Sequence, residues 1–116
     1  MIGVSKMEIE INIKSRNSRA HAQAIYDGKQ VKVKIGGIIS ESFAEHIKGG
    51  KSAKNYRESR EYVTAEGNII KECVFSSPST AAQFVTGRST NGYSAWKVEK
   101  TGQTLGEYLK EQGIRC

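Results

Sequence analysis

Residues 75–97 read FSSPSTAAQFVTGRSTNGYSAWK, and this stretch carries the clearest helix start and stop signals in the chain. Ser77 is a good N-cap residue, and Pro78 suits the first position of a helix. Apolar residues then recur at helical spacing until Gly87, which can end the helix in a left-handed conformation. The stretch therefore predicts a short helix beginning at Pro78.

The sequence on the N-terminal side of this helix alternates between apolar and polar residues, as half-buried strands do. The dipeptide Asp27-Gly28 is a strong hairpin signal, because both positions tolerate a positive φ. A second hairpin is predicted to turn at residues 66–68. The segments with strand character are 9–14, 20–26, 31–35, 61–65 and 69–75.

Two pairs of residues resemble capping boxes, in which a hydroxyl and a glutamate three positions later satisfy the start of a helix. Ser42 with Glu45 predicts a short helix after residue 40, and Thr104 with Glu107 predicts a C-terminal helix ended by Gly113. Strands thus come first and helices last. The order predicts an α+β fold, with an antiparallel sheet of about five strands followed by two short C-terminal helices.

The length and charge of the chain limit what it can do. It has 116 residues, the size of one domain, so we expect a single domain over 1–116. Lysine and arginine total 18 against 12 acidic residues, a net charge of +6. Such a surplus favours anionic partners such as nucleic acid or nucleotides, although it also suits a surface that is merely well solvated.

A basic segment spans residues 48–60. A period of three fits neither a strand nor an ideal helix, so an extended or mobile loop is predicted. This loop is either an arm that contacts phosphate or a solvated surface segment. Its cations are Lys48, Lys51, Lys54, Arg57 and Arg60.

The longest apolar run is far shorter than the ~20 residues that span a bilayer, and the N-terminus lacks the apolar run of a secretory signal. We therefore expect no membrane contact and a cytoplasmic location. In that compartment Cys73 and Cys116 are expected to be free thiols, with Cys73 buried among apolar neighbours.

Signatures of catalysis are missing from the sequence. There are two histidines, in separate elements, and the one aspartate lies in a turn. No paired carboxylates, metal-ligand cluster or phosphate-binding glycine fingerprint is present. We expect no enzyme activity, no catalytic residues, no metal and no cofactor.

The stretch 75–97 offers several groups to an anion. Hydroxyls sit beside free N–H groups at a helix start, and a basic, glycine-bounded loop follows. The predicted phosphate-binding residues are Ser77, Ser79, Arg88, Ser89, Asn91, Arg57, Arg115 and Arg19, and the predicted stacking residues are Tyr93 and Phe75. The alternative is that the serines only cap the helix and the loop residues only form a turn. Trp96 offers a stacking surface as well, but we expect Trp96 and Phe84 in the core.

The pattern F-S-S-P-S-x-A-A-x-F-V-x-G-R-S-x-N-G over residues 75–92 closely resembles the RAMA-like (restriction and adenine-methylation associated) domain. That domain is typically fused behind GIY-YIG nucleases. The resemblance runs from about Lys29 to Leu109 and implies a core over 29–110, to which 1–28 adds an N-terminal hairpin. It also implies a DNA-binding accessory domain of restriction type, reading DNA or modified DNA without catalysis.

As a stand-alone chain, the sequence also looks similar to the phage anti-Thoeris sponge proteins in size and element order. That likeness implies sequestration of a small phosphorylated cyclic nucleotide, of the cyclic ADP-ribose type or a cyclic oligonucleotide, in the host cytoplasm. It also implies a homo-oligomer, in which the extra N-terminal hairpin pairs subunits and Arg19 lies near an interface site. A third alternative is an interaction module whose basic segment binds nothing in particular.

Overall fold

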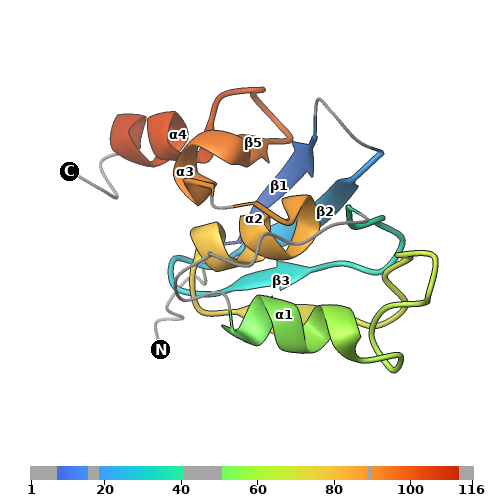
Figure 1. Cartoon of the computed structure of the whole chain (residues 1–116). Coiled ribbons are helices and arrows are strands. Elements are labelled where there is room, and N and C mark those ends of the chain that lie inside the picture. The colour runs from blue at the N-terminus through green and yellow to red at the C-terminus, as the bar shows by residue number, and fades with distance from the viewer. Residues whose placement is uncertain (1–7, 16–18, 41–50, 89, 113–116) are drawn as a thin grey trace, which may run out of the picture.

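The computed structural model describes residues 8–15, 19–40, 51–88 and 90–112. It confirms the predicted α+β fold, with one antiparallel sheet of five strands and several short helices (Figure 1). The elements in chain order are β1 (Ile9–Lys14), β2 (His21–Tyr26), β3 (Val31–Val33), α1 (Lys51–Glu58), β4 (Cys73–Phe75), α2 (Pro78–Thr86), α3 (Gly92–Ala95), β5 (Lys97–Val98) and α4 (Leu105–Glu111).

The strands lie in the order β4-β3-β2-β1-β5. The register of the central hairpin pairs Ile9 with Tyr26 at one end and Lys14 with His21 at the other. The turn after β2 forms as predicted at Asp27-Gly28. The Asp27 carboxylate accepts the backbone N–H of Gln30 at 2.6 Å, and Gly28 has a φ of 98°.

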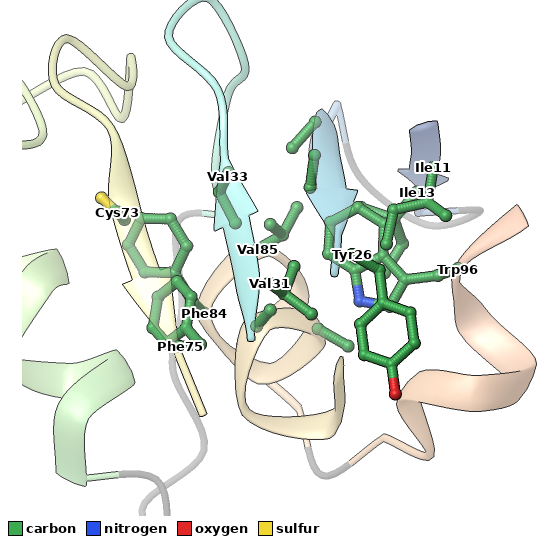
Figure 2. Packing of buried hydrophobic residues seen from close by; sticks show 14 of the residues in the cluster. Ile11, Ile13, Tyr26, Val31, Val33, Cys73, Phe75, Phe84, Val85 and Trp96 are labelled. Carbon is green, nitrogen blue, oxygen red and sulfur yellow. The ribbon is translucent and has the colours of Figure 1, made fainter. Parts of the chain in front are cut away.

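The core lies on one face of the sheet. Because side chains alternate along a strand, Ile11 and Ile13 of β1 point to the same side as Val31 and Val33 of β3, and all four are buried. Helix α2 packs over β2, β3 and β4 and closes this side. Phe84 and Trp96 are both 0% exposed, so their predicted place in the core is confirmed (Figure 2).

The N-terminal hairpin is not an addition to a core over 29–110. β1 lies between β2 and β5, and β2 lies between β1 and β3. Both strands of the hairpin are therefore central, and their apolar residues are part of the core cluster. β5 covers the outer edge of β1 at Ile11 and Asn12, and β3 covers that of β2 at 24–26, while the joining of subunits through this hairpin stays a prediction.

The strand predicted over 61–65 is reduced to a single bridge between Val63 and Ile69. The turn between them forms as expected, because Gly67 takes a φ of 90° and the Thr64 hydroxyl accepts the N–H of Asn68 at 3.0 Å. The chain then leaves this short hairpin and joins the sheet only as β4, against β3. The fifth strand is instead β5, whose two residues pair with β1.

The basic segment 48–60 was expected to be a loop, and its described part contains α1 instead. Ala53, Tyr56 and Arg57 have the i, i+3, i+4 spacing of one helix face, and all three turn inward: Ala53 is 0% exposed and the other two are half-buried. The prediction of a loop was wrong because Arg57 faces the interior, although its charge is typical of a surface residue. With Arg57 on the inner face, the helical spacing becomes clear.

The helix predicted from Ser42 and Glu45, and the helix end at Gly113, lie outside the described residues. Within the described ranges, no helix is long and apolar enough to cross a membrane.

Candidate functional site

The start of α2 forms as the sequence predicts, and Ser77 has a structural task there. Its backbone is extended, and its hydroxyl oxygen accepts the backbone N–H of Thr80 at 3.2 Å. Pro78 follows at the first helical position, and Gly87 ends the helix with a φ of 73°. The Ser77 hydroxyl also lies 3.0 Å from the Thr80 hydroxyl, so its hydrogen bonding is used within the helix cap.

Helix α3 is pressed against the start of α2. The Gly92 N–H donates to the Ser79 hydroxyl oxygen at 3.0 Å, and the Trp96 indole N–H donates to the Pro78 carbonyl at 2.9 Å. A Cβ on Gly92 would lie 2.1 Å from the Pro78 carbonyl carbon, so only glycine fits there. These contacts join residues 77–79 to residues 91–96, and we call them the α2–α3 junction.

Asn91 belongs to the same junction. Its side-chain oxygen accepts the Tyr93 N–H at 3.0 Å and caps α3. Ser77, Ser79 and Asn91 are thus brought to neighbouring positions, as predicted, but each has an intramolecular hydrogen bond. This packing gives a structural reason for the pattern S-P-S at 77–79 followed by N-G at 91–92 and W at 96.

The predicted arginines differ in their surroundings. Arg88 and Arg19 are exposed, and neither pairs with a described carboxylate. Arg88 lies just after α2, where Thr86 and Thr90 hold the turn: the Arg88 N–H donates to the Thr86 hydroxyl at 3.3 Å, and the Thr90 hydroxyl donates to the Arg88 carbonyl at 3.0 Å. Hydrogen bonds on both sides of the Arg88 peptide thus accompany a solvated guanidinium that follows α2.

Arg57 does not belong to this exposed set. Its guanidinium donates to the Phe84 carbonyl at 2.8 Å and to the Ser40 hydroxyl at 2.6 Å. Burial lowers the pKa of Arg57 to about 10, which still leaves it cationic at neutral pH. Since the carbonyl belongs to the last turn of α2, Arg57 acts as a link between α1 and α2 rather than as an arm reaching for phosphate.

The two predicted stacking residues are placed differently. Phe75 is 2% exposed and lies beside Phe84 in the core (Figure 2). Its ring centroid is 5.1 Å from that of Phe84 and 5.1 Å from that of Tyr56. Its faces are covered by the core, so this prediction of a stacking surface is wrong for the folded chain. Tyr93 is half-buried beside α4. Ser89 and Arg115 lie outside the described residues.

Sequence reasoning missed a recess beside α1. It has a volume of about 350 Å³ and is lined by Asn55, Tyr56, Ser59 and Tyr62. We call it the tyrosine recess. Of two further described recesses, one lies around Lys32 on the polar side of the sheet, and the other lies along β1 and β5 beside Tyr108. None of these three is lined by a predicted phosphate-binding residue. The missed signal was the helix α1 itself, which carries Asn55 and Tyr56 and ends directly before Ser59.

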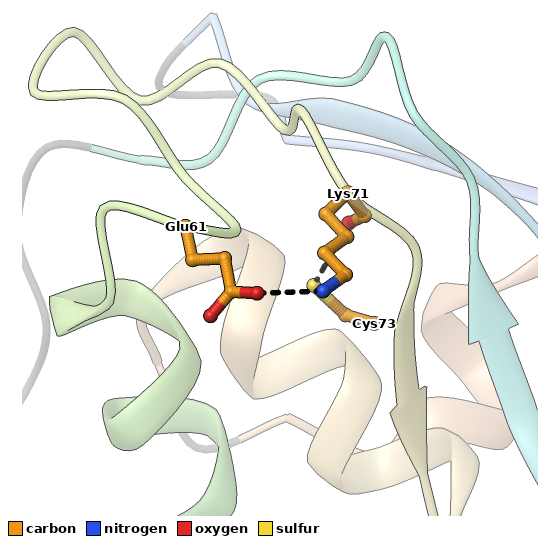
Figure 3. Close-up of polar contacts among 3 residues, drawn as sticks. All are labelled: Glu61, Lys71 and Cys73. Atoms are coloured by element: carbon orange, nitrogen blue, oxygen red, sulfur yellow. Dashed lines mark hydrogen bonds and ion pairs between the residues drawn. The ribbon is translucent and has the colours of Figure 1, made fainter.

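Close to the tyrosine recess, Lys71 forms an ion pair with Glu61, with 2.7 Å between Nζ and Oε1 (Figure 3). This carboxylate raises the pKa of Lys71. The Lys71 ammonium also lies 4.9 Å from the centroid of the Tyr62 ring. Burial raises the pKa of the nearby Cys73 thiol to about 12, with Glu72 adding to the shift, so this thiol is protonated at neutral pH.

No group of three or more histidine, cysteine, aspartate or glutamate residues within the described ranges is arranged to hold a metal ion. Two kinds of group in the described residues can therefore bind a ligand. One is the exposed guanidinium of Arg88 near the α2–α3 junction, and the other is the pair of aromatic rings in the tyrosine recess.

Comparison with known proteins gives one finding. A family model described as a domain of unknown function (DUF4357) matches residues 11–109, which is most of the chain. No curated protein and no solved structure matches. The family match is consistent with the resemblance to RAMA-like domains, and the likeness to anti-Thoeris proteins stays a prediction. The matched range starts inside β1 and ends in α4, so the chain belongs to the DUF4357 family.

Proposed function

We propose that this protein is a non-catalytic module that binds nucleic acid through its phosphate backbone. The observation that carries the proposal is the exposed guanidinium of Arg88, which no described carboxylate neutralises, on a turn held by Thr86 and Thr90. A solvated cation on a fixed turn contributes to phosphate binding without enclosing the ligand.

The distribution of charge supports the same ligand class. The chain carries a net charge of +6, and two ion pairs occur within the described ranges, Lys54 with Glu58 and Lys71 with Glu61. Other cations, Arg19 and Arg88 among them, therefore remain available to an extended polyanion. The resemblance to RAMA-like domains points to DNA as that polyanion.

The competing function, sequestration of a cyclic nucleotide, needs a pocket that encloses the ligand. Ser77, Ser79 and Asn91 were expected to donate to such a ligand. Their side-chain oxygens accept backbone N–H groups of the fold, and none of the three residues lines a described recess. The three described recesses also lie elsewhere. These observations favour an open phosphate-binding surface over an enclosing pocket. Cyclic nucleotides are included among the ligands of the test below.

The test is a binding panel on the full chain, read by calorimetry. Its ligands are a short duplex DNA, the matching single strand, cyclic ADP-ribose and a cyclic dinucleotide. We expect the DNA ligands to bind and Arg88→Ala to weaken them, with an unchanged circular dichroism spectrum. Lys110→Ala is the matched control, since Lys110 is an exposed cation in the last turn of α4.

Equal weakening by Lys110→Ala would show that only net charge matters and that Arg88 has no particular role. Tight binding of a cyclic nucleotide with no DNA binding would replace the proposal by the sponge function. A panel in which nothing binds would contradict both.

A further inference from the structure

The tyrosine recess has the features of a site for a flat aromatic ligand. Its lining consists of the rings of Tyr56 and Tyr62 and the side chains of Asn55 and Ser59, and its surface is mainly apolar. Sites for small aromatic groups usually combine an apolar lining with a few polar groups that fix orientation. The recess lies at α1 and the turn after it.

Both rings are held in place before any ligand arrives. The Tyr56 ring packs edge-on against Phe75 and Phe84 of the core, with centroid distances of 5.1 and 6.1 Å. Its hydroxyl accepts the Val74 N–H at 3.4 Å. Tyr62 in turn meets Tyr56 edge-on at 4.8 Å and 80°. Little side-chain entropy is lost when a ligand stacks on rings that are already fixed.

The polar lining groups are available to a ligand. The side chains of Asn55 and Ser59 make no hydrogen bond within the described residues, whereas the Ser59 backbone N–H and carbonyl serve the turn after α1. An asparagine amide presents a donor and an acceptor together, which is the pattern that matches the edge of a nucleobase.

Basic side chains lie close to the recess, and one of them pairs with no described carboxylate. Lys54 pairs with Glu58 and Lys71 with Glu61, and Arg57 is bonded to Phe84 and Ser40, which leaves Arg60 as the cation without such a pair among the described side chains of 53–62. Arg60 is exposed, and Lys71 places its ammonium 4.9 Å from the Tyr62 ring centroid. A neutral or basic peptide gains nothing from this charge, whereas a base attached to a phosphate backbone does. Charge complementarity therefore selects a nucleotide unit over an apolar protein segment.

We propose that the tyrosine recess takes one unpaired nucleobase of a nucleic-acid strand, stacked on Tyr62 with its edge toward Asn55 and Ser59. Aromatic rings beside a basic surface are the general means by which proteins bind unpaired bases. The inference rests on the proposed function and adds to it, because it makes binding depend on a base that is not in a duplex.

The experiment compares three labelled ligands on the full chain by fluorescence anisotropy: a single strand of about 10 nucleotides, the same strand made of abasic units, and the fully paired duplex. The key variant is Tyr62→Leu, which removes the ring. Tyr62→Phe keeps the ring and should bind like the unchanged protein. Tyr108→Leu is the matched control, because Tyr108 is a half-buried tyrosine on α4.

We expect Tyr62→Leu to weaken binding of the single strand about tenfold, the effect of losing one stacked base. The affinities for the duplex and for the abasic strand should be the same for this variant as for the unchanged protein. Asn55→Ala, at an exposed position that packing does not constrain, should weaken the single strand in the same direction without altering the thermal midpoint.

Equal affinity of Tyr62→Leu and the unchanged protein for the single strand would overturn the inference. If such a strand still bound with a steep salt dependence, the proposed function would survive this failure. If none of the three ligands bound even at low salt, the inference and the proposed function would fall together.

Discussion

At the scale of single residues, Gly92 and Trp96 explain why the stretch 75–97 has its particular sequence. Gly92 is buried where α3 touches the Pro78 peptide, and Trp96 reaches back to the Pro78 carbonyl. The sequence predicts the caps on α2 and the burial of Trp96, because these depend on neighbouring residues and on hydrophobicity. It does not predict that Ser79 serves Gly92, since that contact joins residues 13 positions apart.

Replacing Gly92 tests this packing. In Gly92→Ala the new methyl group would overlap the Pro78 peptide, so we expect the free energy of unfolding to fall by about 3 kcal/mol or the chain to fail to fold. Ser94→Ala, at an exposed position of the same helix, should change it by less than about 0.5 kcal/mol. Urea denaturation measures both. Similar stabilities for the two variants would show that α3 moves freely relative to α2.

Cys73 makes a second prediction at this scale. The thiol is 0% exposed and its pKa is raised to about 12, so both access and ionisation oppose its reaction. In a Cys116→Ser background, we expect iodoacetamide at pH near 8 to label Cys73 only as fast as the protein unfolds. The rate should rise sharply in urea. Rapid labelling of the native protein would mean that β4 opens far more often than its buried packing implies.

At the scale of elements, the sequence predicts the helices whose start and end depend on neighbouring residues, and it misses the elements that depend on contacts with distant residues. The N-caps of α2 and α4 each involve residues no more than three positions apart, and both form as predicted. Helix α1 was missed because Arg57 faces α2 instead of solvent, which only the tertiary structure reveals. Strand β5 was missed because two residues carry no periodic signal; they become a strand only by pairing with β1.

The capping box of α4 gives a prediction for pH. The Thr104 backbone N–H and hydroxyl donate to the Glu107 carboxylate, and these bonds lower its pKa. A lowered pKa in the folded state stabilises the protein above about pH 4.3, the usual value for an unfolded glutamate, and this contribution is lost as the pH falls through the folded pKa.

The comparison is between the unchanged protein and Glu107→Gln, by urea denaturation at a series of pH values. Their difference in unfolding free energy should be constant near neutral pH and shrink below about pH 4 as Glu107 becomes protonated. Thr104→Ala should abolish the shrinkage, because the lowered pKa depends on the threonine. A difference that stays constant into strong acid would exclude this role of the carboxylate.

At the scale of the whole molecule, the sequence predicts the fold class and the sign of the charge but not the geometry of the site. The sheet order places β1 and β5 in neighbouring strands, although their nearest paired residues, Asn12 and Lys97, are 85 positions apart, and no local pattern encodes that. Of the predicted phosphate-binding residues, Arg88 and Arg19 are exposed as expected, while Arg57, Ser77 and Ser79 make hydrogen bonds within the fold.

The oligomeric state also belongs to this scale, and a homo-oligomer remains our prediction. Since β1 and β2 are central, we expect an interface elsewhere than on their paired edges. Light scattering at micromolar protein, with and without a single-stranded oligonucleotide, measures the mass. The mass of a monomer under both conditions would contradict the prediction of a homo-oligomer.

The central claim, that exposed cations bind a phosphate backbone, is tested most directly by the salt dependence of duplex DNA binding. For the unchanged protein the logarithm of the association constant should fall linearly with the logarithm of salt concentration, and Arg88→Ala should reduce the slope by about 1. A slope that Arg88→Ala leaves unchanged, or affinity independent of salt, would contradict the claim.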